Sequence, residues 1–297
     1  MSVGIEVALP ERRAARRAFD RAASQFDAAA FVHDEARNRL LERLDFIRLE
    51  PQVVVDLGCA TGQAATALAA RYPGARVLAL DSSRGMLVAA AAAAAAAARA
   101  GERVAVVGGE AEQLPLRAAC AELVFANFVL PWCRPNLLFA EAARVLRPGG
   151  ALLFATLGPD SLAEVRQAFG GVDDCIHVHA AFDMHDLGDL ALAAGLAEPV
   201  LDVDRLAVTY ADLGALLRDL RAVGAVSTAG GRRRTLTGRE RWRGFERRLQ
   251  PAADSRFAVT IELVLGQAWG REPRPASGPL GEIRVPISSI RRAAEST

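Results

Sequence analysis

Two aspartates, each ending a run of aliphatic residues, are the most informative chemical feature of the sequence. Asp56 ends the run VVVD and is followed by a turn from Gly58 to Gly62, where glycine lets the backbone bend sharply or approach a ligand. Asp81 ends the run RVLALD about twenty residues later, where an acid suits the two hydroxyls of a ribose. The pattern predicts a ligand at the carboxyl ends of two strands, the place where open α/β sheets bind ligands.

The elements that must position these aspartates alternate between strands and helices. Strands are predicted over 52–57, 75–80, 103–108, 121–127 and 150–156. Helices are predicted between them, over 61–72, 83–99 and 135–147. This alternation indicates an α/β fold, in which a parallel sheet carries helices on both faces. Two later strands, over 198–209 and 256–269, would complete a seven-stranded, mostly parallel sheet.

The composition limits the classes of function. The chain has 297 residues, is 52% hydrophobic and has a formal net charge of +1, so it has a full core and no overall attraction to nucleic acid. Its four cysteines form no C-x-x-C pair, which favours free thiols in a reducing cytoplasm over zinc or disulfides. His177, His179 and His185 lack acidic or cysteine partners at ligand spacing, so no metal is expected. No signal peptide or membrane span is predicted.

Four ordered motifs resemble those of class I S-adenosylmethionine-dependent methyltransferases. They are DLGCATG over 56–62, the acidic Asp81, GEAEQLP over 109–115 and RVLRPGG over 144–150. A dinucleotide-binding Rossmann domain is the alternative, but it would have G-x-G-x-x-G where this chain has G-C-A-T-G. The resemblance implies a Rossmann-like fold with S-adenosylmethionine as cofactor. It implies cofactor contacts from Asp56, Gly58, Ala60, Gly62, Asp81, Ser82, Met86, Glu110, Ala111 and Asn127, with Met86 packed on the adenine.

The domain organisation follows from these elements. Residues 1–48 are predicted to form N-terminal helices, over 10–30 and 31–48, which either pack on the domain edge or form a lid over the cofactor. Residues 49–270 form the methyltransferase domain, with an insertion of helices and loop at about 210–250. Residues 271–297 are expected to be a loosely ordered tail, because they contain Pro, Gly and Ser and little periodicity.

Segments outside the cofactor motifs resemble one branch of this superfamily. The likeness is strongest in GPDSL over 158–162, DMHDLGD over 183–189 and GQAW over 266–269, and it extends from about residue 17 to 290. These segments resemble the malonyl-acyl-carrier-protein O-methyltransferase family of biotin synthesis. The resemblance implies methylation of the free carboxylate of a malonyl thioester, with an acidic acyl-carrier protein as partner.

The main requirement of that chemistry is that the enzyme aligns the reacting atoms. A malonyl carboxylate is ionised at neutral pH, so it is already a nucleophile and needs no general base. Burying it requires a cationic partner, and an arginine fork matches a carboxylate. Arg134, Arg166 and one of Arg232 to Arg234 are the candidates, and the sequence does not decide between them. Trp132, after the fourth strand, is either core or an aromatic wall beside the methyl group.

The stretch from Arg232 to Arg248 is strongly cationic. It holds eight arginines against Glu240 and Glu246, a local charge of +6. It is either a solvated helix face and loop or a docking patch for the acidic carrier protein. Only Trp242 and Phe245 are interleaved as stacking aromatics, which argues against nucleic acid.

Four departures from the family pattern keep other functions open. The family usually has Tyr at Phe26 and Gln at His33, and Ala60 and Glu110 replace a glycine and an aspartate. A cofactor-binding scaffold without catalysis, a small-molecule methyltransferase and a relative that hydroxylates a protein arginine during complex I assembly are the alternatives. The oligomeric state, and the choice between carrier protein and coenzyme A, stay open.

Overall fold

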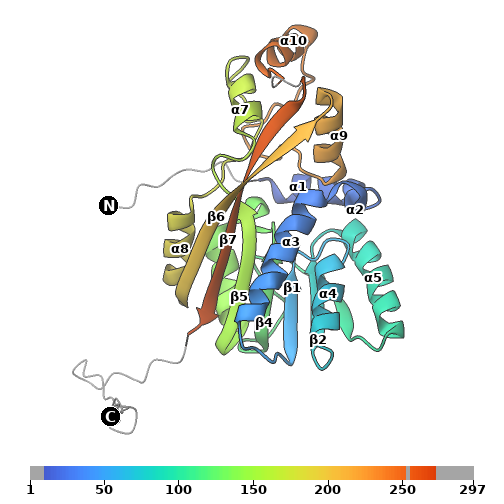
Figure 1. Ribbon diagram of the computed structural model, residues 1–297, viewed down its shortest axis with the longest axis vertical. Helices are drawn as coiled ribbons and strands as arrows, with labels where there is room; N and C mark the ends of the chain where they lie inside the picture. Colours follow the sequence, from blue (N-terminus) through green and yellow to red (C-terminus); the bar gives the residue numbers. More distant parts are fainter. Residues whose placement is uncertain (1–9, 252–254, 272–297) are drawn as a thin grey trace, which may run out of the picture.

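A seven-stranded mixed sheet forms the centre of the computed structural model, which describes residues 10–251 and 255–271 (Figure 1). The strand order is β3-β2-β1-β4-β5-β7-β6. The strands are β1 (Val53–Leu57), β2 (Arg76–Asp81), β3 (Val104–Gly108), β4 (Ala121–Asn127), β5 (Leu146–Leu157), β6 (Leu196–Tyr210) and β7 (Phe257–Gly270). Of these, β1 to β5 pair in parallel, whereas β7 runs antiparallel to both β5 and β6. The predicted Rossmann-like fold class is confirmed.

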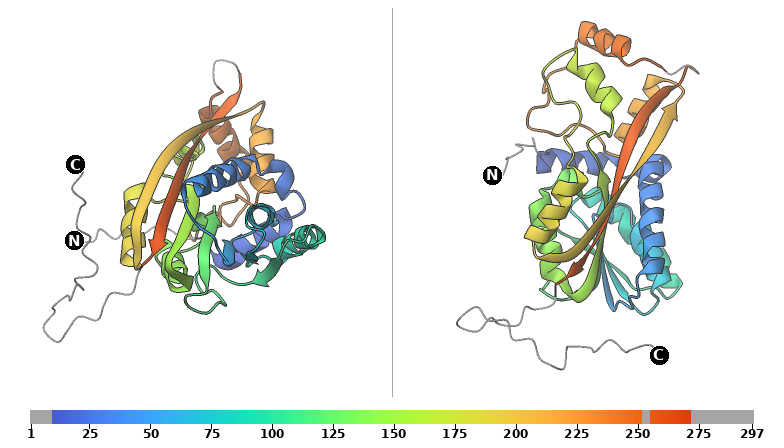
Figure 2. Two further views of the ribbon diagram at one scale, coloured as in Figure 1. Left: turned by 60° about the horizontal axis from the view of Figure 1, so that its bottom comes forward. Right: turned by 60° about the vertical axis from the view of Figure 1, so that its left-hand side comes forward.

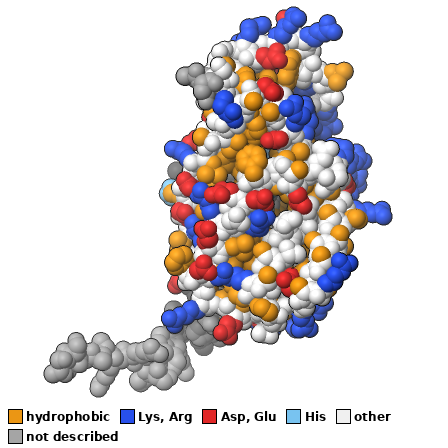
Figure 3. All heavy atoms as spheres, turned by 45° about the vertical axis from the view of Figure 1, so that its right-hand side comes forward, with side chains coloured by type: hydrophobic (Ala, Val, Ile, Leu, Met, Phe, Trp, Pro, Cys, Tyr) orange, Lys and Arg blue, Asp and Glu red, His pale blue; other side chains and the backbone are white. Residues whose placement is uncertain are grey.

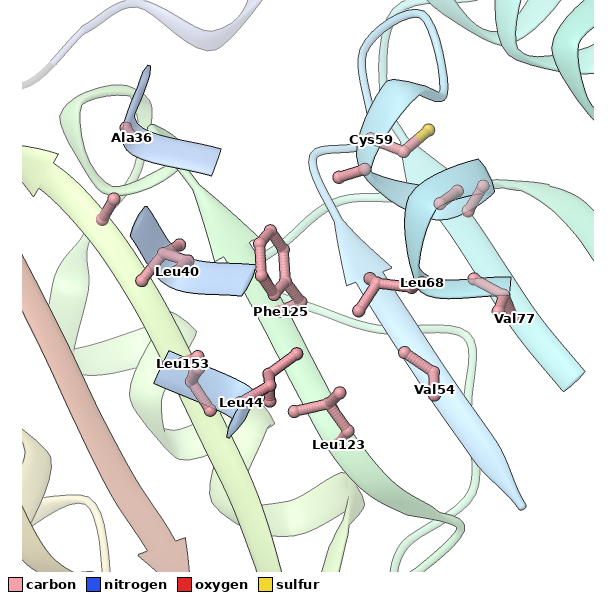
Figure 4. Close-up of a cluster of buried hydrophobic side chains, with 14 of the residues drawn as sticks. Ala36, Leu40, Leu44, Val54, Cys59, Leu68, Val77, Leu123, Phe125 and Leu153 are labelled. Atoms are coloured by element: carbon pink, nitrogen blue, oxygen red, sulfur yellow. The ribbon is translucent and has the colours of Figure 1, made fainter. Parts of the chain in front are cut away.

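Helices cover both faces of this sheet, as the alternation predicted. On one face, α3 (Phe31–Arg43), α4 (Gln63–Arg71) and α5 (Arg84–Arg99) contribute to a core around Phe125 of β4. Figure 4 shows Leu40 and Leu44 from the α3 side and Leu68 from α4 pointing towards Phe125. On the other face, α6 (Pro135–Val145) and α8 (Met184–Ala193) pack on the sheet. The central parallel strands β1, β4 and β5 are therefore buried from both sides, as is usual for parallel sheets.

The N-terminal segment is less regular than predicted. It forms α1 (Arg12–Ala22) and α2 (Phe26–Ala29), separated by a turn over 23–25, where one helix was predicted over 10–30. After α3 comes a short 3-10 helix, η1 (Leu44–Phe46). Figure 1 shows α1 and α2 lying across the carboxyl ends of the strands. The N-terminal helices are thus placed over the edge of the sheet where the two predicted aspartates lie.

A second layer of structure extends beyond that edge. We call it the upper lobe: α7 (Ala163–Gly170), α9 (Leu213–Ala222), α10 (Arg239–Arg248) and the adjoining ends of β6 and β7. Figure 2 shows these two strands running on past the rest of the sheet to carry the three helices. The lobe has its own core around Leu216 and Phe245, against Val259 of β7. Two of its helices come from the predicted insertion at 210–250. The predicted tail lies outside the described residues except for Arg271.

Candidate functional site

The turn after β1 has a backbone that only a few residue types adopt easily. Gly58, Ala60 and Gly62 all have positive φ, of 70°, 45° and 91°. A Cβ at Gly58 would lie 2.4 Å from Val129, so this position needs glycine for space as well as for φ. Ala60 reaches the left-handed region at a cost of about 1 kcal/mol. The turn is therefore a fixed, narrow loop at the carboxyl end of β1.

A cavity with about 750 Å³ of empty space, including its opening to solvent, lies beside this loop. We call it the polar cavity because its lining includes Asp81, Glu110, Glu112 and Asn127. Eight of the predicted site residues line it: Gly58, Ala60, Asp81, Ser82, Glu110, Ala111, Asn127 and Trp132. They come from the ends of β1, β2, β3 and β4, which meet at one edge because these strands are parallel. Separate short motifs of the sequence thus converge on one cavity.

Asp81 lines the cavity and also holds the turn after β1 in place. Its carboxylate accepts hydrogen bonds from the Ala60 N–H at 3.0 Å and the Ser83 N–H at 2.8 Å. Burial raises the pKa of Asp81 above its ordinary value, although these backbone hydrogen bonds act in the opposite direction. The carboxylate lines the cavity at the place where a ribose-binding acid was predicted.

Asp56 and Asn127 lie side by side in a smaller pocket next to the polar cavity. Asp56 Oδ2 and Asn127 Oδ1 are both buried and have no hydrogen-bond partner in the described part of the chain. Burial, together with the nearby Asp81, raises the pKa of Asp56 to about 7. A buried acceptor without a partner costs roughly 1–3 kcal/mol. Two such acceptors in one pocket fit a ligand that donates hydrogen bonds and carries positive charge.

Two residues predicted to contact the cofactor, Gly62 and Met86, lie outside the polar cavity. Gly62 is buried at the N-cap of α4 and does not line the polar cavity. Met86 is 1% exposed and packs with Ala22, Phe26 and Val223 under the N-terminal helices. Neither position is in contact with the cavity in this structure, so adenine packing by Met86 stays a prediction.

Polar contacts hold the N-terminal helices over the cavity. Asp20 of α1 accepts from the Ser83 hydroxyl at 2.7 Å and the Gly85 N–H at 2.9 Å. Asp27 of α2 accepts from the Thr61 hydroxyl at 2.5 Å. Phe19 of α1 and Phe26 of α2 line the cavity itself. These contacts attach the N-terminal helices to the loops after β1 and β2, and the lid over the cofactor stays a prediction.

A second cavity, of about 730 Å³, lies between the N-terminal helices and the upper lobe. It is mostly apolar, with its wall built from α3, α9 and the lobe ends of β6 and β7. Its apolar lining includes Phe31, Val32, Leu157, Leu162, Val208, Leu216, Leu220, Val223, Val259 and Ile261. The two cavities share three wall residues, His33, Phe128 and Trp132. The two cavities are therefore neighbours, and these three side chains form their common boundary.

Sequence reasoning gave no site role to two of these three shared residues. Phe128 has a φ of 55°, unusual for a bulky residue, and turns the chain at the end of β4. Its ring packs against His33 with ring centroids 4.9 Å apart. Nothing in the local sequence signals the strained backbone, and His33 was noted only as a departure from the family pattern. Trp132 was predicted, and it packs edge-on against Phe19 at 4.8 Å.

The arginines predicted to meet the substrate are engaged elsewhere. Arg134 bonds to Glu112 through its guanidinium, at 2.6 Å, and through its backbone N–H. Arg166 donates to the carbonyls of Pro159 and Ser161. Arg233 pairs with Asp173 at 2.9 Å. None of these arginines is among the described residues that line the two cavities.

Two other classes of site were sought in residues 10–251 and 255–271. No group of three or more His, Cys, Asp or Glu side chains in those ranges could hold a metal ion. None of the described helices has the length and apolar character needed to cross a membrane.

Comparisons with known proteins agree with the geometry. The methyltransferase domain family matches residues 55–154, from β1 to β5. Among solved structures, the YcgJ protein of Bacillus subtilis aligns with a TM-score of 0.57 and 16% identity, covering 78% of this chain and 98% of that one. A putative methyltransferase from Bacillus halodurans aligns with a TM-score of 0.51 and 21% identity, covering 78% and 99%. These likenesses show the fold.

Curated relatives match nearly the whole chain. A malonyl-[acyl-carrier protein] O-methyltransferase from a Methylovorus species is 41% identical over 97% of this chain and 98% of its own length. The protein of that name from Laribacter hongkongensis is 43% identical over 89% and 90%. The match thus includes the upper lobe and the N-terminal helices as well as the cofactor motifs. The chain belongs to the malonyl-[acyl-carrier protein] O-methyltransferase family.

Proposed function

We propose that this protein transfers the methyl group of S-adenosylmethionine to the free carboxylate of a malonyl group on acyl-carrier protein. The observation that carries the proposal is the meeting of a polar and an apolar cavity at one wall, above the carboxyl ends of the strands. A methyl donor and an acceptor must lie side by side, and two cavities with a common boundary at His33, Phe128 and Trp132 suit that arrangement. The activity named for the curated relatives supports the same reaction.

The cofactor is S-adenosylmethionine, and the described residues fit it. It supplies an electrophilic methyl group on a positively charged sulfur. Asp81 is suited to the ribose hydroxyls, because its carboxylate lines the polar cavity. Asp56 and Asn127 would accept from the ammonium group, which would satisfy their two unpartnered oxygens. These assignments rest on the position of each group in the cavity and on the chemistry of its atoms.

Alignment and exclusion of water are what the chain contributes to the reaction. The malonyl carboxylate is ionised at neutral pH, so no residue has to remove a proton from it. Phe128 and Trp132 line both cavities, and Phe19 lines the polar cavity. These aromatic rings keep water from the reacting groups. The N-terminal helices cover the polar cavity through Asp20 and Asp27. Catalysis then depends on holding the carboxylate oxygen in line with the methyl carbon and the sulfur.

The carrier protein would dock on α10. Figure 3 shows arginine side chains gathered at the end of the molecule where α10 lies. Arg239, Arg241 and Arg247 are exposed and form no ion pair within the described part of the chain. Arg232 and Arg234 pair instead with Glu11, so the first arginines of the cationic stretch are partly neutralised. Unpaired positive charge on α10 suits an acidic carrier protein.

The reaction is tested by mass spectrometry of malonyl-acyl-carrier protein after incubation with S-adenosylmethionine. The proposal predicts the mass increase of one methyl ester on the malonyl carrier, and none on acetyl-carrier protein, which lacks the free carboxylate. Malonyl-coenzyme A serves as the third acceptor and shows whether the protein part of the substrate is needed. Confirmed cofactor binding without any ester on the malonyl carrier would overturn the proposal.

The place of this reaction in biotin synthesis and in the cytoplasm belongs to the same proposal. The four cysteines Cys59, Cys120, Cys133 and Cys175 are all free thiols, which suits a reducing compartment. Rescue of growth without biotin, in cells lacking their own enzyme, would test the pathway. Failure of rescue despite ester formation in vitro would separate the chemistry from the pathway.

A further inference from the structure

His33 occupies a central position between the two cavities. It lines the polar cavity, the apolar cavity and the small pocket that holds Asp56. Its ring lies edge-on between Phe26, with centroids 5.1 Å apart, and Phe128. Its backbone carbonyl accepts a hydrogen bond from Asn127 Nδ2 at 2.9 Å. The protein thus fixes the ring firmly by packing and by the backbone.

The nitrogens of that well-held ring have no hydrogen-bond partner. His33 Nδ1 is buried and unpartnered, and no hydrogen bond to Nε2 is formed within the described residues. A buried imidazole nitrogen without a partner costs roughly 1–3 kcal/mol, so native proteins rarely leave one without a reason. Across the same junction, the Trp132 indole N–H also lacks a protein acceptor among the described residues. Both rings are therefore held in place by packing, while His33 Nδ1 and the Trp132 indole N–H have no hydrogen-bond partner among the described residues.

Among the described residues that line these cavities, every cation is already paired. Arg12 pairs with Glu112, and Arg37 pairs with Asp34 at 2.7 Å. The other titratable groups that line these cavities are two thiols, Cys59 and Cys133, together with acids and a phenol from α2, the ends of β1 to β3 and the upper lobe. The acids and the phenol are Asp27, Asp56, Asp81, Glu110, Asp219 and Tyr210. An incoming carboxylate would therefore find its hydrogen-bond donors in His33 and Trp132.

We propose that His33, assisted by the Trp132 indole N–H, binds and positions the acceptor carboxylate for methyl transfer. This inference rests on the proposed function. It supplies the substrate-binding group that the sequence assigned to an arginine. One oxygen of the carboxylate accepts the hydrogen bonds, and the other lies directly against the methyl group, with no side chain between them.

Neutral donors suit the charge changes of this reaction. The carboxylate oxygen forms a bond to the methyl carbon, the carbon–sulfur bond breaks, and its electron pair stays on sulfur. A carboxylate and a sulfonium thereby become a neutral ester and a neutral thioether, and no proton moves. Burial lowers the pKa of His33 to about 4, so the ring is an uncharged donor at neutral pH. It therefore orients the oxygen while drawing less electron density from it than a guanidinium would.

The test compares His33→Phe with His33→Gln, measuring kcat/KM for malonyl-carrier protein, the Kd for S-adenosylmethionine and the melting temperature. Phe keeps a ring for Phe26 and Phe128 but removes both nitrogens, whereas Gln keeps an uncharged N–H donor. We expect His33→Phe to lose about 100-fold in kcat/KM, as for a lost hydrogen bond to a charged group. Cofactor affinity should stay within about 3-fold, and the melting temperature should not fall, because an unsatisfied nitrogen is gone.

His33→Gln should recover most of the lost kcat/KM, and Trp132→Phe should lose about 10-fold. A purely structural role for His33 would instead lower the melting temperature and weaken cofactor binding in His33→Phe. Full activity of His33→Phe beside an active wild type would overturn this inference alone. No ester from the wild type, with cofactor bound, would overturn the proposed function and this inference together.

Discussion

The polar and apolar cavities are built in different ways. Residues at the ends of β1 to β4 and in the loops that follow them supply much of the polar cavity, and hydrogen bonds such as that between Ala60 and Asp81 fix their backbone. The apolar cavity is assembled from α2, α3, α9 and the ends of β6 and β7, which are far apart in the sequence. The first can bind a cofactor through a fixed set of polar atoms. The second depends on how the upper lobe packs, so it is the part able to vary with the acceptor.

The largest effect is expected on cofactor affinity, from a substitution in the polar cavity. Asp81→Asn keeps the size of the side chain but removes the carboxylate that holds Ala60 and lines the cavity. We expect the Kd for S-adenosylmethionine, measured by calorimetry, to rise by about 100-fold, since hydrogen bonds to charged groups contribute roughly 1.5–3 kcal/mol each. Asp45→Asn, at an exposed acid on η1, is the control and should bind normally. An unchanged Kd in Asp81→Asn would remove the ribose assignment.

The second largest effect is expected on the KM for malonyl-carrier protein, with no change in cofactor binding. Changing Arg239, Arg241 and Arg247 to serine should raise the KM for malonyl-carrier protein by about 10- to 30-fold at low salt, because charge steers association. The KM for malonyl-coenzyme A and the Kd for the cofactor should not change. The control replaces three exposed arginines outside the upper lobe with serine and so removes the same charge. They are Arg76, Arg99 and Arg103. Equal losses in both triple variants would show a general charge effect in place of a docking site.

Cofactor affinity should depend on pH through Asp56. Burial raises its pKa to about 7, so below pH 7 the folded protein holds a proton there. An ammonium group beside Asp56 favours the ionised form, so binding must release this proton. We expect affinity to fall by up to about tenfold per pH unit below pH 7 and to level off above it. Calorimetry at pH 6, 7 and 8 measures this, and Asp56→Asn should flatten the profile. A profile unchanged by that substitution would assign the titration to another group.

The smallest effect concerns the loop of the polar cavity. Ala60 has positive φ, so Ala60→Gly should relieve strain of about 1 kcal/mol, partly offset by the greater freedom of glycine when unfolded. The melting temperature should rise by about 1–3 °C. Ala119→Gly is the matched control, because Ala119 also has positive φ but lies exposed and away from both cavities. A marked fall in stability in Ala60→Gly would mean that the Ala60 methyl packs usefully against its neighbours.

The sequence predicted the polar cavity far better than the apolar one, for physical reasons. Asp56, the glycines and Asp81 carry their own signals, because turn geometry and strand ends depend on adjacent residues. The alternation of elements predicted the seven-stranded sheet, including the two late strands that complete it, but not the order of its strands.

What the sequence did not predict depends on distant partners. Arg134 pairs with Glu112, and Arg166 bonds to the carbonyls of Pro159 and Ser161, outside both cavities, so their substrate roles stay predictions. The position of His33 depends on Phe128, whose backbone conformation no local pattern indicates. An arginine was expected to bind the carboxylate because charge pairing is the general rule, and only the assembled cavity shows where its cations are engaged.

The division between the cavities is tested most directly by filling the apolar one. Leu220 of α9 lines it, and Leu220→Trp would occupy space that the acceptor needs. Methyl transfer and cofactor binding should be measured on the same preparation. We expect at least a tenfold higher KM for malonyl-carrier protein, with the Kd for S-adenosylmethionine within about 2-fold of wild type. Unimpaired methyl transfer by Leu220→Trp, or an equal loss of cofactor binding, would contradict it.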